Sequence, residues 1–381
     1  MVDFVFKLDP KVIIGTDTIN WISKVIEPYG NRVMVVTEPV LYENNVIDRV
    51  SQVLSEANIE FIVFDNVPPQ ATAQVAEEVA ELARAARCSV IIGLGGIKTQ
   101  AIAKIASLVF PAGTYLFDIL DNEIRPSSFL PYVAVPTSGR DPFLFANSCV
   151  AVDPRDRSVK LVETPESLCV ATILDENVSE SLSEKFAATT AFDGFLIAFE
   201  AYLSTKISFI GEALLERAFV LYRQLFDSFS TNKMGDLGKI SSQAGFLTSL
   251  GASVSSPGIG TALAYALNAR FPVAKSWCST ILLPHIMEFL LSARPERLAR
   301  IAELIGEPTE GVSKSEAAHM AIEAIRRWMG ILQVPGRLKD LDLVLERLVP
   351  VAESARSLPF VAYSARPITV EETYELLKEA Y

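Results

Sequence analysis

Residues 89–96, Ser-Val-Ile-Ile-Gly-Leu-Gly-Gly, decide the fold class of this chain. The first four have the apolar, β-branched character of a buried strand, and helical apolar spacing resumes from Thr99 to Val109. A strand that ends in a glycine-rich turn before a helix is typical of parallel α/β sheets. The N–H groups at the start of such a helix point at one spot, and the helix dipole adds positive potential there. The turn therefore predicts either a phosphate-binding site or only a tightly packed connection. The candidate phosphate-binding residues are Gly93, Leu94, Gly95 and Gly96.

Strand and helix patterns alternate in the first part of the chain and give way to helices later. The predicted strands are residues 32–37, 60–64, 89–92 and 132–135, and the predicted helices are residues 46–57, 73–87 and 99–109. From about Ser179 long amphipathic helices dominate, and the last begins with a capping box from Thr369 to Glu372. Because 381 residues exceed one ordinary core, we expect an α/β parallel-sheet domain over residues 1–178 and an all-α domain over residues 179–381.

Charge and composition exclude several classes of protein. The formal net charge of −12 disfavours nucleic acid or an anionic membrane as the main partner. The N-terminus lacks a charged segment followed by a long apolar run, so no signal peptide is expected. Residues 240–269 carry no charge, but Pro257 and small polar residues interrupt them, which favours buried helices over a membrane span. A cytoplasmic protein is expected.

The cysteines and histidines restrict the metal chemistry that this chain can support. The four cysteines are far apart and form no CxxC pair, which predicts reduced and mostly buried thiols. They are Cys88, Cys149, Cys169 and Cys278. The chain has two histidines, His285 and His319, so three histidine ligands cannot come from one chain. Any metal would need mostly carboxylate, cysteine or water ligands.

Two other predicted strands also end in residues that suit a nucleotide. Glu38 follows the first strand, where a carboxylate accepts hydrogen bonds from an adenosine ribose and repels a 2′-phosphate. Thr137 and Ser138 follow the strand at residues 132–135, and their hydroxyls suit a phosphate or a nicotinamide. Together with the glycine turn they predict a dinucleotide-binding domain that prefers NAD to NADP. The alternative for Glu38 is a solvated loop carboxylate.

Several short motifs occur in a specific order along nearly the whole chain. They are residues 37–38 (Thr-Glu), 68–72 (Pro-Pro-Gln-Ala-Thr), 92–96 (Ile-Gly-Leu-Gly-Gly), 135–138 (Val-Pro-Thr-Ser), 174–175 (Leu-Asp), 193–197 (Asp-Gly-Phe-Leu-Ile), 200–202 (Glu-Ala-Tyr), 281–287 (Ile-Leu-Leu-Pro-His-Ile-Met) and 366–372 (Arg-Pro-Ile-Thr-Val-Glu-Glu). In this combination the sequence resembles the iron-type alcohol dehydrogenase family, which is related to glycerol dehydrogenase and dehydroquinate synthase. The resemblance implies a dehydroquinate synthase-like fold with an NAD(P)-binding domain, a helical domain and an active site in the cleft between them. It also implies a small alcohol or carbonyl substrate and a homodimer or larger homo-oligomer.

The resemblance implies a metal site from which this chain departs. Family members typically hold one iron or zinc ion through an Asp and three His, and the ion acts as a Lewis acid during hydride transfer. The Asp is retained as Asp193, whereas the three histidine positions carry Ile197, Thr261 and Lys275, and a further family histidine is Tyr265. Ile offers no lone pair, Thr is a poor ligand and a protonated Lys repels a cation. We therefore expect no tightly bound iron or zinc.

The cofactor side departs from the family pattern as well. Gly96 replaces a usual Ser, and Thr99 replaces a frequent Asp. The family's threonine-rich loop is shortened to residues 138–142, Ser-Gly-Arg-Asp-Pro, in which Arg140 either adds charge at a phosphate or pairs with a neighbouring carboxylate. The expected cofactor contacts that remain in this region are Thr137, Ser138 and Lys160.

The altered site admits a catalytic and a non-catalytic interpretation. In the first, an NAD-linked oxidoreductase works without a metal, and Lys275, held by Asp193, polarises the carbonyl while Tyr265 or His285 relays the proton. The expected catalytic residues are then Asp193, Lys275 and Tyr265. In the second, the chain is a catalytically inactive relative with a binding or assembly role, and Asp193–Lys275 is only a buried ion pair.

A third interpretation and two local alternatives also stay open. A lyase or a phosphate-ester-handling synthase would need a basic cluster, for which Arg270 and Arg366 are candidates beside Lys275. His285 is interpreted as a structural histidine or, in the first interpretation, as the proton relay. Cys278 is interpreted as a packing residue or as a low-pKa thiol next to the lysine.

Overall fold

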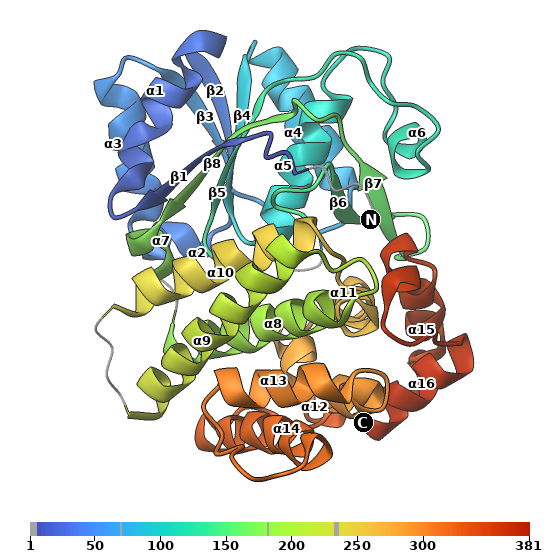
Figure 1. The fold of residues 1–381 in the computed structure, drawn as a ribbon. Helices are drawn as coiled ribbons and strands as arrows, with labels where there is room; N and C mark the ends of the chain where they lie inside the picture. Colours follow the sequence, from blue (N-terminus) through green and yellow to red (C-terminus); the bar gives the residue numbers. More distant parts are fainter. Residues whose placement is uncertain (1–5, 69–70, 181–182, 232–235) are drawn as a thin grey trace. The chain divides into compact units, whose positions relative to one another are not determined.

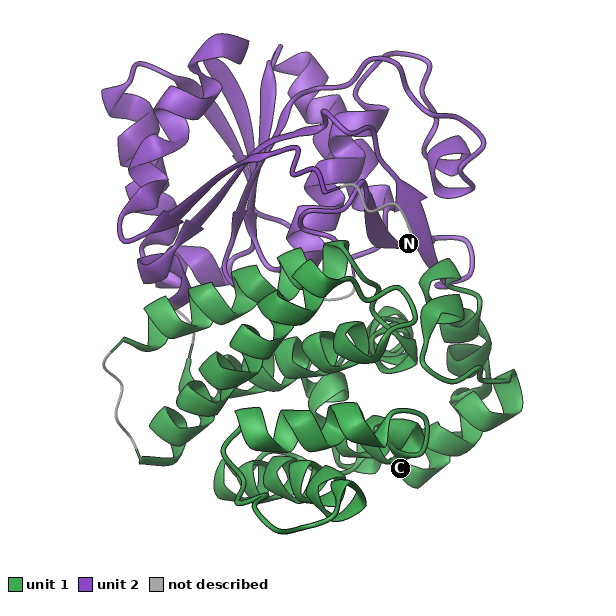
Figure 2. Cartoon of the chain, viewed as in Figure 1, with its two compact units in different colours: residues 1–4, 140–142, 183–381 green, residues 5–139, 143–182 purple. Residues whose placement is uncertain are grey.

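A computed structural model describes residues 6–68, 71–180, 183–231 and 236–381. The chain forms two compact units, coloured separately in Figure 2. The α/β unit comprises residues 5–139 and 143–182, and the helical unit includes residues 140–142 and 183–381. The boundary expected after residue 178 falls inside helix α7 (Glu176–Glu180). Residues 69–70 of the Pro-Pro-Gln-Ala-Thr motif and the first five residues of the chain lie outside the described residues.

A six-stranded parallel sheet with the order β1-β8-β5-β4-β2-β3 forms the centre of the α/β unit (Figure 1). The strands are β1 (Lys11–Gly15), β2 (Arg32–Val36), β3 (Glu60–Phe64), β4 (Val90–Gly95), β5 (Tyr132–Pro136) and β8 (Cys169–Asp175). The longer helices of this unit are α3 (Val46–Glu56), α4 (Gln74–Ala85) and α5 (Ile97–Val109), with α2 (Val40–Glu43) directly after β2. Strands β6 (Ser148–Val152) and β7 (Val159–Glu163) pair separately as an antiparallel hairpin.

Central position explains the composition of β4. All six of its residues are buried, as expected for a parallel strand that is covered on both faces. Figure 1 shows α3 on one side of the sheet and α4 and α5 on the other. The chain runs from β2 outward to β3 and then returns across β2 to β4, after which it continues in the opposite direction to β5. The connections therefore reverse between β2 and β4, and ligands of open α/β sheets bind at the carboxyl ends of strands at such a point.

The helical unit contains nine α-helices among the described residues. They are α8 (Glu184–Leu203), α9 (Phe209–Thr231), α10 (Leu237–Ser253), α11 (Ile259–Arg270), α12 (Lys275–Leu291), α13 (Pro295–Leu304), α14 (Lys314–Ile331), α15 (Val349–Arg356) and α16 (Val370–Glu379). Aromatic side chains join three of them, because the Phe226 ring of α9 lies 4.5 Å from that of Phe192 on α8 and 4.6 Å from that of Trp328 on α14. Such contacts bury large apolar areas and stabilise the unit.

One helix of the described residues, α8, is long and apolar enough to cross a membrane by length and composition. Of its most apolar window, 89% is buried inside the protein, as in a core helix. The uncharged segment at residues 240–269 forms parts of two helices, α10 and α11, which are separated around Pro257. The prediction of interrupted, buried helices in that segment is therefore confirmed.

The predicted strands and helices occur in the structure, but the glycine turn begins later than predicted. Gly93 and Gly95 pair with Ala134 and Pro136 of β5, so the strand continues through them instead of ending at residue 92. Helix α5 accordingly begins at Ile97 rather than at Thr99. The capping box at Thr369 is confirmed, because its hydroxyl accepts from the Glu372 amide and the Glu372 carboxylate accepts from the Thr369 amide.

Gly194 provides a direct test of packing beside the candidate site. A Cβ at this position would overlap the buried Tyr222 hydroxyl, which is hydrogen-bonded to Thr248 at 2.9 Å. We expect Gly194→Ala to lower the free energy of unfolding by about 1–3 kcal/mol, measured by urea denaturation, because overpacked cores must shift. The matched control is Gly330→Ala in α14, where a Cβ meets no atom within 4 Å. An equal or higher stability of Gly194→Ala would contradict the packing argument.

Candidate functional site

The glycine turn and Glu38 lie at the ends of two adjacent strands. Strands β2 and β4 pair directly, and Glu38 and Gly96 follow them at the carboxyl edge of the sheet. The Gly96 amide donates a hydrogen bond to the Glu38 carboxylate, with 2.6 Å between the nitrogen and Oε1. The two sequence features therefore form one site at the reversal point of the sheet, where open α/β folds bind ligands.

Gly95 allows other groups to approach the turn closely. Its φ of +156° is one that side chains rarely adopt, and an added Cβ would lie 2.8 Å from Glu38 Oε1 and 2.9 Å from Thr99. Gly96 is the N-cap of α5, so the first amides of that helix lack helical acceptors. A turn that accepts no Cβ at Gly95 and opens onto a helix N-terminus fits a pyrophosphate.

Gln100 holds the glycine turn in shape. Its side-chain amide donates to the carbonyls of Gly93 and Gly95 at 2.9 Å and 3.0 Å, and its Oε1 accepts from the Tyr132 hydroxyl. These bonds orient the turn from inside the core, where an unmet carbonyl would be costly. Gln100 was not among the residues expected from the sequence, although a glutamine in a largely apolar helix, one turn after a glycine turn, is a recognisable signal.

The other expected cofactor contacts differ in their surroundings. Thr137 is buried, and its amide donates to the Gly95 carbonyl at 3.1 Å, which places the end of β5 against the turn. Ser138 follows it and is also buried. Lys160 lies instead on β7 of the hairpin, where its ammonium pairs with Asp121 at 3.4 Å.

In the helical unit, the carboxylate of Asp193 receives three charged or polar groups. Asp193 lies in the middle of α8 and has no exposed surface. The Lys275 ammonium, at the first residue of α12, lies 2.5 Å from its Oδ1, and the Ser279 hydroxyl one turn later donates to the same oxygen at 2.6 Å. Arg140 Nε donates to Oδ2 at 2.7 Å. We call Arg140, Asp193, Lys275 and Ser279 the Asp193 cluster.

The charge balance of the cluster keeps Asp193 ionised. Burial by itself would raise the pKa of this carboxyl, but Lys275 and Arg140 outweigh burial and lower the pKa to about 2. Both cations are themselves more than nine-tenths buried. Of the two alternatives for Arg140, the structure has the pairing with a carboxylate. Ser279 was missed, although it stands four residues after Lys275 on the same helix face.

The structure brings the three expected catalytic residues together. It does not support the two alternatives, a proton relay by His285 and a low-pKa thiol at Cys278. The Lys275 ammonium pairs with Asp193 and lies 4.7 Å from the centre of the Tyr265 ring. Lys275 therefore contacts both of the other residues. His285 comes ten residues after Lys275 on α12, about 15 Å further along the helix axis. Burial raises the pKa of the Cys278 thiol to about 12, so the alternative of a low-pKa thiol is wrong.

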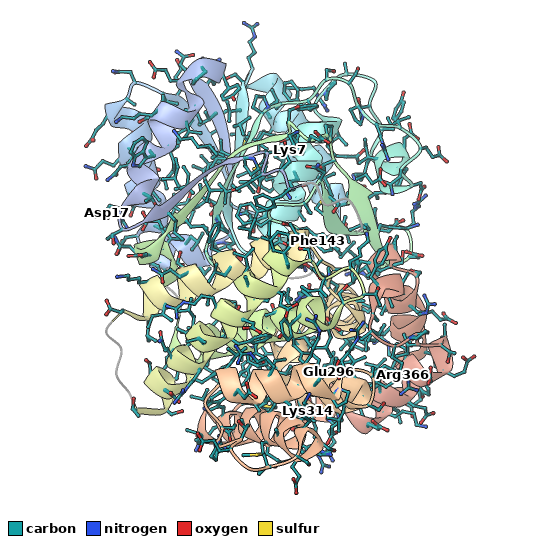
Figure 3. The ribbon with its side chains drawn as sticks, viewed as in Figure 1. Lys7, Asp17, Phe143, Glu296, Lys314 and Arg366 are labelled. Atoms are coloured by element: carbon teal, nitrogen blue, oxygen red, sulfur yellow. The ribbon has the colours of Figure 1, made fainter. Side chains whose placement is uncertain are left out.

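His285 faces a different feature of the helical unit. It lines an open groove of about 730 Å³ between the middle of α12 and the C-terminal parts of α14 and α16, together with Arg326, Arg337 and Lys378. Burial lowers its pKa, against the opposing charges of Glu288 and Glu379. Arg366, labelled in Figure 3, pairs with Glu372 at 2.5 Å and lies over the Phe289 ring. Its surface pairing gives no support to a phosphate-handling cluster.

The family metal positions of this chain do not fit a divalent ion. Asp193 already accepts from two cations and a hydroxyl, and Ile197 has no donor atom. The Thr261 hydroxyl donates to the Glu200 carboxylate at 2.6 Å and is therefore engaged elsewhere. Within residues 6–68, 71–180, 183–231 and 236–381, no group of three or more His, Cys, Asp or Glu side chains could hold a metal.

The structure defines a two-part protein with an α/β unit built on a parallel sheet and an all-helical second unit. Residues 9–176 match the family model "Iron-containing alcohol dehydrogenase", and residues 187–381 match the C-terminal model of the same family. The chain belongs to the iron-containing alcohol dehydrogenase family. The predicted family and fold class are thereby confirmed.

Named relatives resemble the chain along most of its length. The 1,3-propanediol dehydrogenase of Citrobacter freundii is 24% identical over 355 residues, which is 92% of each protein. The NAD-dependent methanol dehydrogenase of Bacillus methanolicus is 22% identical and covers 98% of this chain and 99% of its own length. A crystal structure of 1,3-propanediol oxidoreductase superposes with a TM-score of 0.91 at 22% identity and full coverage of both chains, which confirms the fold.

The ion pairs of the Asp193 cluster predict a large stability effect. Asp193→Asn leaves two buried cations without their counter-charge, and we expect a loss of about 3–5 kcal/mol in the free energy of unfolding at neutral pH. The matched control, Asp227→Asn, removes an exposed partner of Arg223 and should change stability by less than about 1 kcal/mol. The contribution of ionised Asp193 is complete above the ordinary carboxyl pKa of 3.8 and is lost as the pH falls towards 2. A wild-type advantage that disappears well above pH 4 would contradict this assignment.

The donor chemistry predicts how the protein responds to metals. Protein produced with added iron and zinc should retain well below one metal ion per chain after dialysis, measured by elemental mass spectrometry. Restoring the family ligands in the triple variant Ile197→His, Thr261→His, Lys275→His should raise the bound metal, because histidine nitrogens replace a cation, a poor donor and a side chain without any donor atom. Stoichiometric metal in the wild type that only chelators remove would show that other ligands serve.

Proposed function

We propose that the chain is an NAD-linked oxidoreductase that interconverts a small alcohol and its carbonyl compound, with a lysine ammonium in the role of the metal. The observation that carries the proposal is the Lys275 ammonium 2.5 Å from Asp193, at a position where the family pattern has a metal-binding histidine. Membership in a family of oxidoreductases supports the reaction type. The names of relatives that act on 1,3-propanediol and methanol support a small substrate.

Lys275 suits the electrophilic role. Its ammonium carries three N–H donors, and the bond to Asp193 uses one of them. Its side chain is only 8% exposed, so a hydrogen bond to a substrate oxygen would be strong in this low-dielectric surrounding. Negative charge that develops on a carbonyl oxygen during reduction would be stabilised there, as in other preorganised sites.

Asp193, Ser279 and Arg140 position the ammonium. Asp193 Oδ1 holds Lys275 and Ser279, and Oδ2 holds Arg140, so the carboxylate is fixed from both oxygens. Gly139 alone separates Arg140 from Ser138 in the chain.

Tyr265 is the proposed proton-relay residue. The Lys275 ammonium lies 4.7 Å from the centre of its ring, so the phenol adjoins the proposed electrophile. Reduction of a carbonyl requires one proton on the product oxygen, and the reverse reaction removes it. We assign this proton transfer to the Tyr265 hydroxyl.

The glycine turn is the proposed pyrophosphate site, with Glu38 as the ribose acceptor. Bound NAD would supply or accept the hydride. Leu94 and the three glycines of the turn would admit the phosphates, and Thr137 and Ser138 would donate to the remaining cofactor atoms. The carboxylate of Glu38 would repel a 2′-phosphate, which favours NAD over NADP. Lys160 remains a proposed contact on the hairpin.

The second candidate is a catalytically inactive relative. The burial of all three charges favours it, because a salt-bridged triad inside a helical unit also serves as a purely structural link. In either case we propose that the protein is cytoplasmic and forms a homodimer or larger homo-oligomer. The net charge of −12 supports partners other than nucleic acid and anionic membranes.

Substitution of Lys275 separates the two candidates. We expect the wild type to consume NADH with small aldehydes in the presence of EDTA, and Lys275→Met to lower kcat/KM by about 100-fold or more, as loss of an oxyanion-stabilising donor does elsewhere. Lys275→Arg should recover part of the rate, and Lys239→Met, which removes an exposed lysine of α10, should match the wild type. Full activity of Lys275→Met would refute the catalytic role. Absence of any nicotinamide-dependent turnover in the folded wild type would favour the inactive relative.

A further inference from the structure

We propose that Glu38 is an internal competitor for the phosphate groups of the nucleotide. In the structure its carboxylate accepts a hydrogen bond from the Gly96 amide, and nucleotide binding would move it from that amide to the ribose hydroxyls. The inference rests on the proposed function for the identity of the nucleotide. According to this proposal, Glu38 lowers the affinity of the turn for phosphate. Tight binding of a nucleotide then depends on its ribose as well.

The carboxylate lies where a phosphate oxygen would bind. It accepts the Gly96 hydrogen bond at 2.6 Å, a charge-assisted bond at the positive end of a 13-residue helix. Added Cβ atoms at Gly95 and Gly96 would lie 2.8 Å and 3.4 Å from Glu38 Oε1. The close approach that the glycines allow is thus used by the chain's own carboxylate.

The carboxylate and a pyrophosphate exclude each other from this amide. One N–H group donates one strong hydrogen bond, and two anions at hydrogen-bond distance from it would repel each other. A phosphate therefore has to displace Glu38. Since Glu38 stands at the end of β2, beside the reversal point of the sheet, a ribose bound there would give it a new set of donors.

Two further observations at this edge of the sheet point to a ligand. The hydroxyl of Thr37, adjacent to Glu38, is fully buried and has no hydrogen-bond partner in the described part of the chain. A buried hydroxyl in that state is costly, and a ligand atom would satisfy it. Lys98, in the first turn of α5, brings a positive charge: burial and the charge of Arg157 lower its pKa to about 8, against the opposing effect of Glu38. Lys98 thus provides a cation two residues after Gly96, which suits an incoming phosphate.

The inference predicts that separate parts of the nucleotide respond in opposite ways to loss of Glu38. Inorganic pyrophosphate has no ribose, so the Glu38 carboxylate only competes with it for the Gly96 amide. Adenosine has no phosphate, so it meets only the ribose acceptor. ADP carries both groups and should show the two effects partly cancelled.

The test is isothermal titration calorimetry of these three probes with the full chain. We expect Glu38→Gln and Glu38→Ala to bind pyrophosphate about ten-fold more tightly than the wild type, the equivalent of about 1.4 kcal/mol. Glu38→Ala should bind adenosine more weakly, because the ribose acceptor is gone. The control Glu43→Gln removes the same charge from an exposed residue of α2 and should match the wild type with every probe.

Three outcomes would overturn the inference. Pyrophosphate that binds equally or more weakly to both Glu38 variants would show that the carboxylate does not compete. Binding of pyrophosphate by none of the proteins would show that the turn is not a phosphate site. Equal gains in Glu43→Gln would show a general charge effect. None of these outcomes depends on turnover. The inference about Glu38 can therefore fail while the Lys275 experiment supports the oxidoreductase, and it can hold while that experiment fails.

Discussion

The buried carboxylate of Asp193 is the constraint on which the helical unit depends. A charge with no exposed surface is stable only if other groups replace its hydration, and here an ammonium, a guanidinium and a hydroxyl do so. These groups come from the first two turns of α12 and from residues 140–142. The carboxylate on α8 therefore joins three segments that are distant in sequence, and it does so by the same charge compensation that a metal ion would provide.

A second buried acid in the same unit is stabilised in a different way. Glu200 accepts hydrogen bonds from the amides of Gly258, Gly260 and Thr261 and from the Thr261 hydroxyl, at 2.6–3.1 Å, at the start of α11. No cation is among these partners, and burial outweighs the hydrogen bonds and raises the pKa of Glu200. The pKa of Asp193 moves in the opposite direction because its partners are charged. This division explains why Thr261, although at a metal position of the family, belongs to the helix cap and not to the Asp193 cluster.

Local sequence patterns predicted the features that depend on neighbouring residues and missed those that depend on distant ones. The central strands were evident because burial on both faces requires runs such as residues 89–92. Strands β1 and β8 were missed, since they are recognisable only through their mutual pairing, in which Lys11 aligns with Ala171. The Asp193–Lys275 pair was predicted from the family pattern. The partner of Arg140 stayed open, and the contact of Glu38 with Gly96 was not foreseen because it requires β2 and β4 to be neighbours.

In each unit a side chain of the protein occupies a position that would suit a bound ligand. Lys275 stands at a position where the family pattern has a metal ligand, and Glu38 occupies an amide that suits a phosphate oxygen. The two cases differ in their chemical consequences. Among the described residues Glu38 accepts a hydrogen bond from Gly96, and we propose that a phosphate displaces it, whereas Lys275 contacts a carboxylate that two other groups fix in place. An ammonium also carries half the charge of a divalent ion and offers directed hydrogen bonds instead of exchangeable coordination sites. In the proposed mechanism, Lys275 would therefore polarise a carbonyl less than a divalent ion does, and catalysis would rely on the rigid positioning of the ammonium by the Asp193 cluster.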